Sequence, residues 1–325
     1  MNVQTTRQWM VTHDWMVKPM AQTEWINGQG VMVWLAEVFS ALGSGLFLVS
    51  LFFNSWWGAL FGWLVIVLFK FPLHLFYLGK PSRVWRAFPP FSKAWRTSWF
   101  ARGVVFTALF VGVGAVQLVT SFLLDHDAIS GSAASAIVVV DWVAMVVSGI
   151  FVVLTGVYAG FAMSYCKSVP FWNTGLLPIV FLLMGVADGL ALVTAVGLVT
   201  GGVEASSVES VTRVVLIINS LLMLAYLLNA RYRSLAAELS VRELVVGRLA
   251  AVFWGGVVVL GIVLPLMVSL ASLFTGEVSL PILVAAIVCH TVGAFALKYS
   301  VLKVGIYRPL FAHGPGSGVS RAPRE

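Results

Sequence analysis

Long apolar runs dominate the chain, and short polar segments separate them. A helix needs about 20 apolar residues to cross a hydrocarbon core about 30 Å thick, because each residue advances it by about 1.5 Å. Eight runs reach that length: residues 31–53, 57–78, 101–124, 136–163, 174–200, 211–229, 248–274 and 280–302. We expect each run to be helical, since irregular backbone in lipid leaves polar groups unpaired.

Composition supports this interpretation and excludes a soluble domain. The chain is 60% hydrophobic and only 10% charged, far from the balance of a soluble globular protein. The first thirty residues mix polar and aromatic side chains, unlike a signal peptide, so we expect them to be retained. The sequence therefore predicts an all-α integral membrane protein with eight transmembrane helices.

A faint internal repeat suggests how the helices are grouped. The segment Arg231–Arg248 is basic and lies where a basic segment lies four helices earlier, between the second and third runs. We expect two four-helix bundles, 31–163 and 174–302, between an N-terminal segment 1–30 and a tail 303–325. Charge selection alone also makes such loops alike, so an unrelated pair of loops is an open alternative.

The distribution of positive charge predicts orientation. Lys and Arg concentrate in the cytoplasmic segments of membrane proteins. Nearly all of the 20 Lys and Arg fall on one side if the N-terminus is inside, with Lys298 counted in that inner flank and Arg213 on the outer side. We therefore expect both termini, and the basic segment 79–102, on the cytoplasmic side.

The basic segment between the second and third runs is the most distinctive stretch. It carries six basic residues and no acidic one: Lys80, Arg83, Arg86, Lys93, Arg96 and Arg102. Four aromatic residues accompany them: Trp85, Phe88, Trp95 and Trp99. Positive charge attracts an acidic partner, and aromatic side chains are typical binding hot spots. We predict a docking surface built from Arg83, Trp85, Arg86, Lys93, Arg96 and Trp99, together with residues 1–30.

Two blocks of sequence resemble a known family. LGKPSRVWRAF followed by SWFARG is similar to the loop of the NrfD-type polysulfide reductase membrane subunits, which are related to the anchor subunits of dimethyl sulfoxide reductases. Tyr158-Ala159-Gly160, Pro170-Phe171-Trp172-Asn173 and Leu177-Pro178 resemble a second block of that family. With the helix count, the resemblance covers most of the chain.

The resemblance implies a function. It implies a haem-free subunit of a bacterial or archaeal cytoplasmic membrane that exchanges electrons between a quinone, menaquinone or ubiquinone, and a ferredoxin-like iron–sulfur partner. That partner in turn serves a molybdopterin catalytic subunit. Relatives often carry His or Asp where this chain has Tyr77, with His74 one turn earlier, so a proton-handling residue does not transfer to one position. Many relatives face the periplasm with their partner, whereas the charge pattern here predicts a cytoplasmic partner.

The candidate site lies on the first four helices. Counted from the helix ends at about 1.5 Å per residue, Glu37, His74 and Tyr158 fall at one depth, roughly 6 to 9 Å from the cytoplasmic boundary. Lys70, His74 and Tyr77 are spaced i, i+4, i+7 and share a helix face. Intramembrane ionisable residues are expensive and usually functional. Each of these three residues also has a non-functional interpretation. Lys70 could snorkel to the membrane surface, Tyr77 could be an interfacial aromatic residue, and His74 could bond to a backbone carbonyl.

These side chains suit a quinone headgroup. His74 is the best proton acceptor, because its unperturbed pKa of about 6.5 is nearest to working pH. We expect Glu37 to pass the proton onward, Tyr158 to bind a ring oxygen, Tyr77 to line the site, Lys70 to act as charge partner, and Phe71 and Phe76 to hold the ring.

Other classes of function remain open at this stage. A haem anchor needs paired intramembrane histidines, but only His74 and His290 lie within spans, and at different depths. Cys166 and Cys289 have no cluster-ligand spacing, so we expect no metal site here and iron–sulfur clusters on a partner. The alternatives to a quinone-reactive subunit are a structural anchor without quinone turnover and a transporter with helices broken near Asp188. Asp188 and His290 can also extend a proton path outward.

Overall fold

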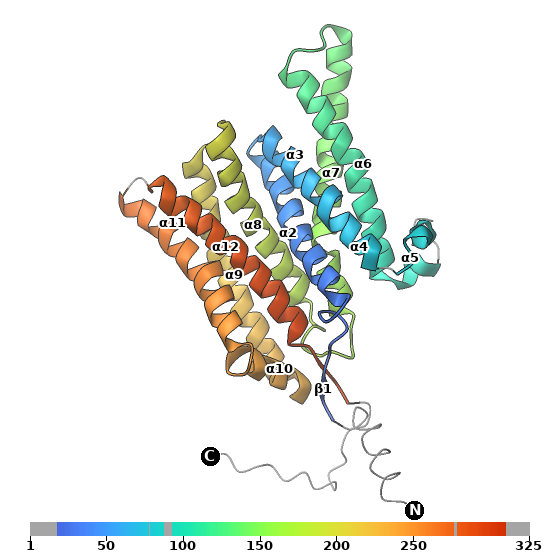
Figure 1. Ribbon diagram of the computed structural model, residues 1–325. Helices are drawn as coiled ribbons and strands as arrows, with labels where there is room; N and C mark the ends of the chain where they lie inside the picture. The colour runs from blue at the N-terminus through green and yellow to red at the C-terminus, as the bar shows by residue number, and fades with distance from the viewer. Residues whose placement is uncertain (1–17, 78, 88–92, 276–277, 310–325) are drawn as a thin grey trace, which may run out of the picture.

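The computed structural model describes residues 18–77, 79–87, 93–275 and 278–309 (Figure 1). Among these residues, eight helices are long and apolar enough to span a membrane. They are α2 (Gly30–Phe52), the run of α3 (Trp56–Val65), η1 (Ile66–Lys70) and α4 (Phe71–Tyr77), α6 (Trp99–Asp125), α7 (Ser132–Ser164), α8 (Leu176–Thr200), α9 (Ala205–Arg233), the run of η3 (Val252–Val263) and α11 (Leu264–Thr275), and α12 (Leu280–Lys303). The predicted all-α membrane fold is confirmed, with every span within a few residues of its expected place.

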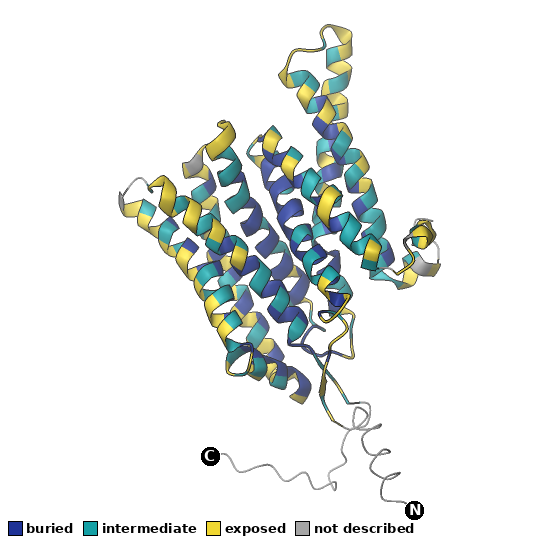
Figure 2. Ribbon diagram, in the orientation of Figure 1, coloured by how far each residue is buried: buried dark blue, intermediate teal, exposed yellow. Residues whose placement is uncertain are grey.

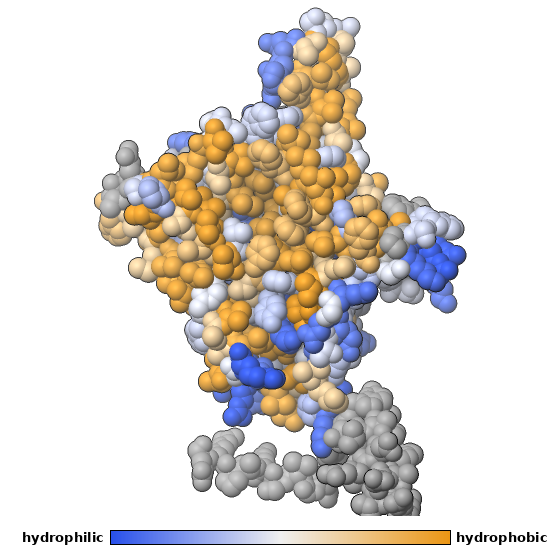
Figure 3. Space-filling view, in the orientation of Figure 1, coloured by the Kyte–Doolittle hydropathy of each residue, from blue (hydrophilic) through white to orange (hydrophobic). Residues whose placement is uncertain are grey.

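The molecule is apolar outside, as a lipid solvent requires. Large hydrophobic side chains such as Phe52, Val139 and Phe274 are exposed, and Figure 3 shows apolar residues covering most of the visible face of the helices. In water such a surface is an interaction site, but in a bilayer it is the ordinary exterior.

The helices α2 and α8 form the centre of the protein (Figure 2). In their most apolar windows 72% of α2 and 67% of α8 is buried, against 17% for α7. Glycines allow the two backbones to touch: a Cβ on Gly45 would lie 2.7 Å from the carbonyl carbon of Gly185, and one on Gly189 would strike the Gly45 carbonyl. Small residues permit such close approach between membrane helices.

The grouping of helices is less clear-cut than predicted. α2 packs against α3 and α7 of the first half, and also against α8 and α12 of the second. The division into bundles 31–163 and 174–302 therefore stays a prediction, as does the orientation with both termini inside.

The two ends of the described chain meet at one end of the helices. Strands β1 (Met20–Ala21) and β2 (Ile306–Tyr307) pair antiparallel, and the buried Gln22 donates to the carbonyl of Leu302. We call this end, which also carries the segment between α4 and α6, the basic end. Residues 18–27 of the predicted docking segment 1–30 thus lie against their own chain, and residues 1–17 are outside the described residues.

Short helices occupy the segments between the spans. The basic segment forms η2 (Pro81–Ala87) and α5 (Lys93–Thr97), and Ser98 then caps α6 by accepting from the amide of Ala101. Sequence reasoning missed α10 (Leu235–Val245), which follows α9 and packs against α9, β2 and η3.

Candidate functional site

Three side chains from three helices meet near the basic end. The hydroxyl of Tyr158 on α7 lies 2.5 Å from Nε2 of His74 on α4 and 3.3 Å from Oε1 of Glu37 on α2. Nε2 of His74 and Oε1 of Glu37 are 3.7 Å apart. The structure therefore brings together the three residues that were expected at one depth.

The hydrogen bonds of this cluster imply that a proton can cross it. A tyrosine hydroxyl carries one hydrogen, so Tyr158 donates to either Glu37 or His74 and accepts a hydrogen bond from a protonated neighbour. Reversing the two bonds moves a proton from one neighbour to the other. Oε2 of Glu37 has no hydrogen-bond partner among the described residues, so the carboxyl has a free oxygen for a further donor.

Lys70 belongs to this cluster and does not snorkel. It is 2% exposed and donates to the hydroxyl of Thr107 on α6, which itself donates to the Gly103 carbonyl at 2.8 Å. Its ammonium lies 4.9 Å from the centre of the Tyr158 ring. The snorkelling alternative is therefore wrong for this residue, whose amino group lies beside the tyrosine ring.

Packing fixes the position of both rings. His74 stacks on Phe100, with centroids 5.5 Å apart. A Cβ on Gly103 would lie 2.7 Å from Cγ of Tyr158, so only glycine leaves room for that ring. Sequence reasoning missed Thr107, Phe100 and Gly103, which lie in an ordinary apolar run and show their importance only through these contacts.

A small cavity adjoins the cluster. It measures about 20 Å³, and its lining includes Lys70, Phe71, His74, Val84 and Tyr158. That volume holds a water molecule, and a quinone ring would fit only if some of the lining residues moved.

Two predicted site residues lie away from the cluster. Phe76 is 61% exposed, so the expectation that it holds a ring is wrong. Tyr77 is half-buried, and within the described chain no hydrogen bond or ring contact joins it to the cluster. A helix turn of π type, η1, precedes α4, and such a turn shifts the faces that an i, i+4, i+7 spacing predicts.

The basic segment presents its charges outward. Arg83, Trp85, Arg86, Lys93 and Arg96 are all exposed, whereas Phe88 lies outside the described residues. Trp99 is half-buried and stacks on Phe161 at 4.8 Å, with the guanidinium of Arg102 4.5 Å from its ring. Trp99 therefore packs between the basic segment and the transmembrane helices and does not face outward.

The charge pattern of the sequence predicted the wrong environment for one further buried residue. Lys298 on α12 was counted in the inner flank, but it is 2% exposed and lies among the helices. The charges of both Lys70 and Lys298 act on Glu37. A single lysine near the end of an apolar run carries no sequence signal that separates a buried position from a flanking one.

Fold and site thus define a multi-span helical membrane protein with a buried, proton-bearing cluster beneath a basic surface. Residues 54–309 match the family described as polysulphide reductase, NrfD, and the chain belongs to that family. It is 26% identical to the C subunit of polysulfide reductase from Wolinella succinogenes over 166 residues, 49% of this chain and 52% of that relative. It is 28% identical to protein NrfD of Escherichia coli over 165 residues, 48% of this chain and 50% of the relative.

A third similar protein is the NrfD homolog of Haemophilus influenzae, 25% identical over 164 residues, 48% of this chain and 50% of that protein. The chain spans about half the length of the curated relatives that it matches. The resemblance drawn from the two sequence blocks is confirmed at the level of the family.

Proposed function

We propose that this chain is the membrane subunit of a reductase complex and reacts with a quinone, menaquinone or ubiquinone, at the Glu37–His74–Tyr158 cluster. The observation that carries the proposal is the buried hydrogen-bonded trio, because proton-sharing groups inside a membrane are expensive to keep. The similarity to the polysulfide reductase C subunit supports the placement in a redox complex.

Each residue of the cluster has a separate role in the proposed reaction. Tyr158 hydrogen-bonds a ring oxygen and orients the headgroup, and His74, 2.5 Å from its hydroxyl, accepts the proton that a quinol releases. Glu37 holds that proton next, and its free Oε2 passes it on. Lys70 balances the negative charge of the ionised cluster.

The partners follow from the basic segment. A ferredoxin-like iron–sulfur subunit with an acidic face would bind over Arg83, Arg86, Lys93 and Arg96, with the exposed ring of Trp85 as its anchor. A site directly beneath that surface keeps the electron path to the partner short. The substrate chemistry would then belong to a molybdopterin subunit on the cytoplasmic side.

The test of the site uses the assembled complex. His74→Ala and Tyr158→Phe should lower quinone-linked turnover at least tenfold while activity with an artificial dye persists, because the dye bypasses the site. Tyr226→Phe is the matched control: it removes a buried hydroxyl that donates to the Phe171 carbonyl at 2.9 Å, in the other half of the protein. Full quinone activity in both site variants would mean that the chain is a structural anchor.

The test of docking is charge reversal. Arg83→Glu with Arg86→Glu should release the partner from membranes, because two attractive contacts become repulsive. Arg231→Glu with Arg242→Glu makes the same change in net charge in another exposed basic segment, and should leave the partner bound. A partner that stays on membranes in the first variant contradicts the proposed surface.

A further inference from the structure

A second buried ionisable cluster lies deeper in the protein. Nε2 of His290 on α12 is 3.0 Å from Oδ1 of Asp188 on α8, and its Nδ1 is 2.8 Å from the carbonyl oxygen of Gly261 in η3. Asp188 and His290 are 1% and 2% exposed. This pair is separate from the cluster at the basic end.

The contacts of His290 suit a pair that holds an extra proton. A carbonyl oxygen only accepts hydrogen bonds, so Nδ1 of His290 carries a hydrogen. Nε2 then faces the Asp188 carboxyl at 3.0 Å, and a proton on either group would make this contact attractive. Such a pair can take up or release one proton without breaking its packing.

Lys298 is a buried residue near both clusters. Its ammonium lies 3.2 Å from the centre of the Phe181 ring on α8 and has no hydrogen-bond acceptor among the described residues. The charges of both Glu37 and Asp188 act on it. A buried ammonium without a fixed partner is costly, and no hydrogen bond among the described residues holds it toward either carboxylate.

The helix registers place Lys298 at the depth of Glu37. Gly185 packs against Ala41, and one turn further toward the basic end these helices carry Phe181 and Glu37. On α12, His290 and Lys298 share one face and lie eight residues, or about 12 Å, apart. Helical side chains lean toward the N-terminus of their helix, so the lysine stem extends from its Cα toward His290.

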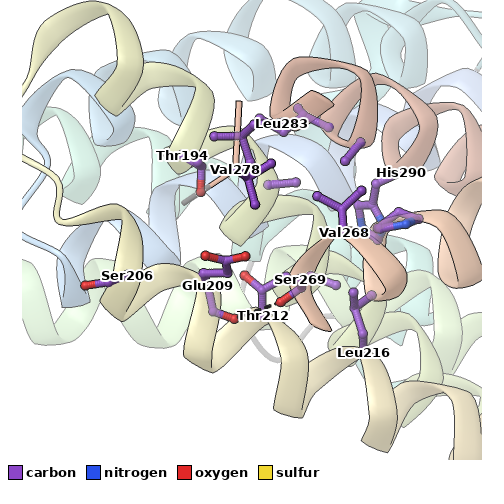
Figure 4. A pocket seen from close by; sticks show the side chains of 15 residues that line it. Thr194, Ser206, Glu209, Thr212, Leu216, Val268, Ser269, Val278, Leu283 and His290 are labelled. Atoms are coloured by element: carbon purple, nitrogen blue, oxygen red, sulfur yellow. Dashed lines mark hydrogen bonds between the residues drawn. The ribbon is translucent and has the colours of Figure 1, made fainter. Parts of the chain in front are cut away.

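A cavity adjoins the deeper pair on the side away from the basic end. A cavity of about 290 Å³ runs between α8, α9, α11 and α12 (Figure 4). Ser206, Glu209 and Val278 line its outer part and His290 its inner part, with Thr194 and Thr212 between. The neighbouring charge, Arg213, is turned onto the Ser269 carbonyl at 2.8 Å. The volume accommodates several waters at about 30 Å³ each.

We propose that Lys298 carries protons between Glu37 and the Asp188–His290 pair, and that the cavity connects this pair to water at the end opposite the basic end. In one direction, the Asp188–His290 pair releases its extra proton to a cavity water and then takes a proton from the Lys298 ammonium. The neutral amine left on Lys298 accepts the proton of the Glu37 carboxylic acid. The reverse order delivers protons inward.

This inference rests on the proposed function, because the protons are those of the quinone reaction at the first cluster. It adds that quinone turnover moves protons to or from the opposite end of the membrane. The electrons leave or enter at the basic end, so the route makes turnover electrogenic.

The experiment uses the whole complex in vesicles, with one pH-sensitive dye inside and another outside. Lys298→Met should cut the pH change on the cavity side at least tenfold per quinone reacted. Leu297→Met, which places the same side chain at the neighbouring buried position, should leave it unchanged. An unaltered ratio of protons to quinone in Lys298→Met would overturn the proposal.

A second variant tests the cavity without touching either cluster. Ala286, one turn outward from His290, lines the cavity, whereas Ala285 is exposed on the outer surface of α12. Ala286→Leu should slow the pH change on the cavity side severalfold, and Ala285→Leu should not. Equal rates in the two variants would contradict water access through this cavity.

The two proposals fail in different ways. If His74→Ala keeps full quinone activity, the proposed quinone site is wrong. If quinone activity depends on His74 while Lys298→Met and Ala286→Leu keep the normal pH change, the site stands and the proton route is wrong.

Discussion

At the scale of single residues, buried polar side chains in this protein often donate a hydrogen bond to a backbone carbonyl of a neighbouring helix. Ser40 donates to the Thr155 carbonyl at 2.9 Å, and Trp63 donates to the Val111 carbonyl at 2.9 Å. Twelve buried side-chain atoms of the described chain have no hydrogen-bond partner, and Oε2 of Glu37 and Nζ of Lys298 are two of them. Unpaired polar atoms in a membrane interior carry a free-energy penalty of several kcal/mol, and these two belong to ionisable groups on the proposed proton route.

Lys298→Met gives a direct test of that penalty. Removing a buried ammonium without a hydrogen-bond acceptor, and keeping a side chain of similar length, should stabilise the protein. We expect the melting temperature of the detergent-solubilised protein to rise by a few degrees. A fall instead would show that Lys298 has a structural partner and would remove the premise of the proton route.

Gly103→Ala tests the packing of the site. The new methyl group would lie 2.7 Å from Cγ of Tyr158, so the ring must move away from His74 and Glu37. We expect lower quinone-linked turnover and a loss of about 1–3 kcal/mol in stability from overpacking. Gly112→Ala in the same helix meets no atom within 4 Å, and should leave turnover unchanged and stability equal or slightly higher.

Sequence reasoning found Glu37, His74 and Tyr158 because depth along a helix can be counted from residue numbers. It missed Thr107 and Gly103, because an apolar run does not show which face meets a neighbouring helix. It also misplaced Lys298, since a charge near a helix end is usually solvated. The roles of these residues depend on contacts between helices, and a single sequence does not show which residues make those contacts.

At the scale of elements, every span was predictable from its length in apolar residues. The π-type segments η1 and η3 and the short α10 were not, because they do not change the hydrophobic count. They still matter: Gly261, whose carbonyl receives the His290 hydrogen bond, lies in η3.

The contact between α2 and α8 gives an asymmetric prediction. A Cβ on Gly45 would collide with the Gly185 carbonyl, whereas a Cβ on Gly185 would meet Ala41 at an ordinary 3.6 Å. Gly45→Ala should therefore destabilise the protein by about 1–3 kcal/mol, and Gly185→Ala should be tolerated. Thermal unfolding of the two variants in detergent measures this, and equal melting temperatures would contradict the close packing of these helices.

The strand pair at the basic end depends on pH through Glu24 and Tyr307, whose side chains are joined by a 2.9 Å hydrogen bond. Hydrogen bonds from its own backbone amide and from the Tyr307 hydroxyl lower the pKa of Glu24 below its ordinary 4.5. Burial and the bond to Glu24 raise the pKa of Tyr307 to about 12. The stabilisation by this contact is therefore fully present between about pH 4.5 and pH 10. It is lost as the pH falls through the lowered pKa of Glu24 or rises through the Tyr307 pKa of about 12.

Tyr307→Phe should thus lower the melting temperature slightly at pH 7, because the contact is exposed and surface pairs contribute little. The difference from the unchanged protein should shrink as the pH falls below about 4.5, where Glu24 becomes protonated. A difference that stays constant down to pH 3 would show that the hydroxyl acts through another partner.

At the scale of the whole molecule, the two ends differ in charge and in chemistry. The exposed arginines and lysines of η2 and α5, the strand pair and α10 belong to the basic end, where the Glu37 cluster also lies. The cavity that reaches His290 begins at the opposite end. Which end faces the cytoplasm decides where the partner binds and in which direction protons move.

The distribution of positive charge predicts that the basic end is cytoplasmic, and cysteine labelling in intact cells tests this. Ser130 and Ser168 are exposed in the α6–α7 and α7–α8 connections, at opposite ends of α7. Cys166 and Cys289 are replaced first, although burial raises the pKa of the Cys166 thiol and so reduces its reactivity. An impermeant maleimide should label Ser130→Cys in intact cells and Ser168→Cys only after permeabilisation. The opposite pattern would place the partner on the outer side and reverse the direction of the proposed proton route.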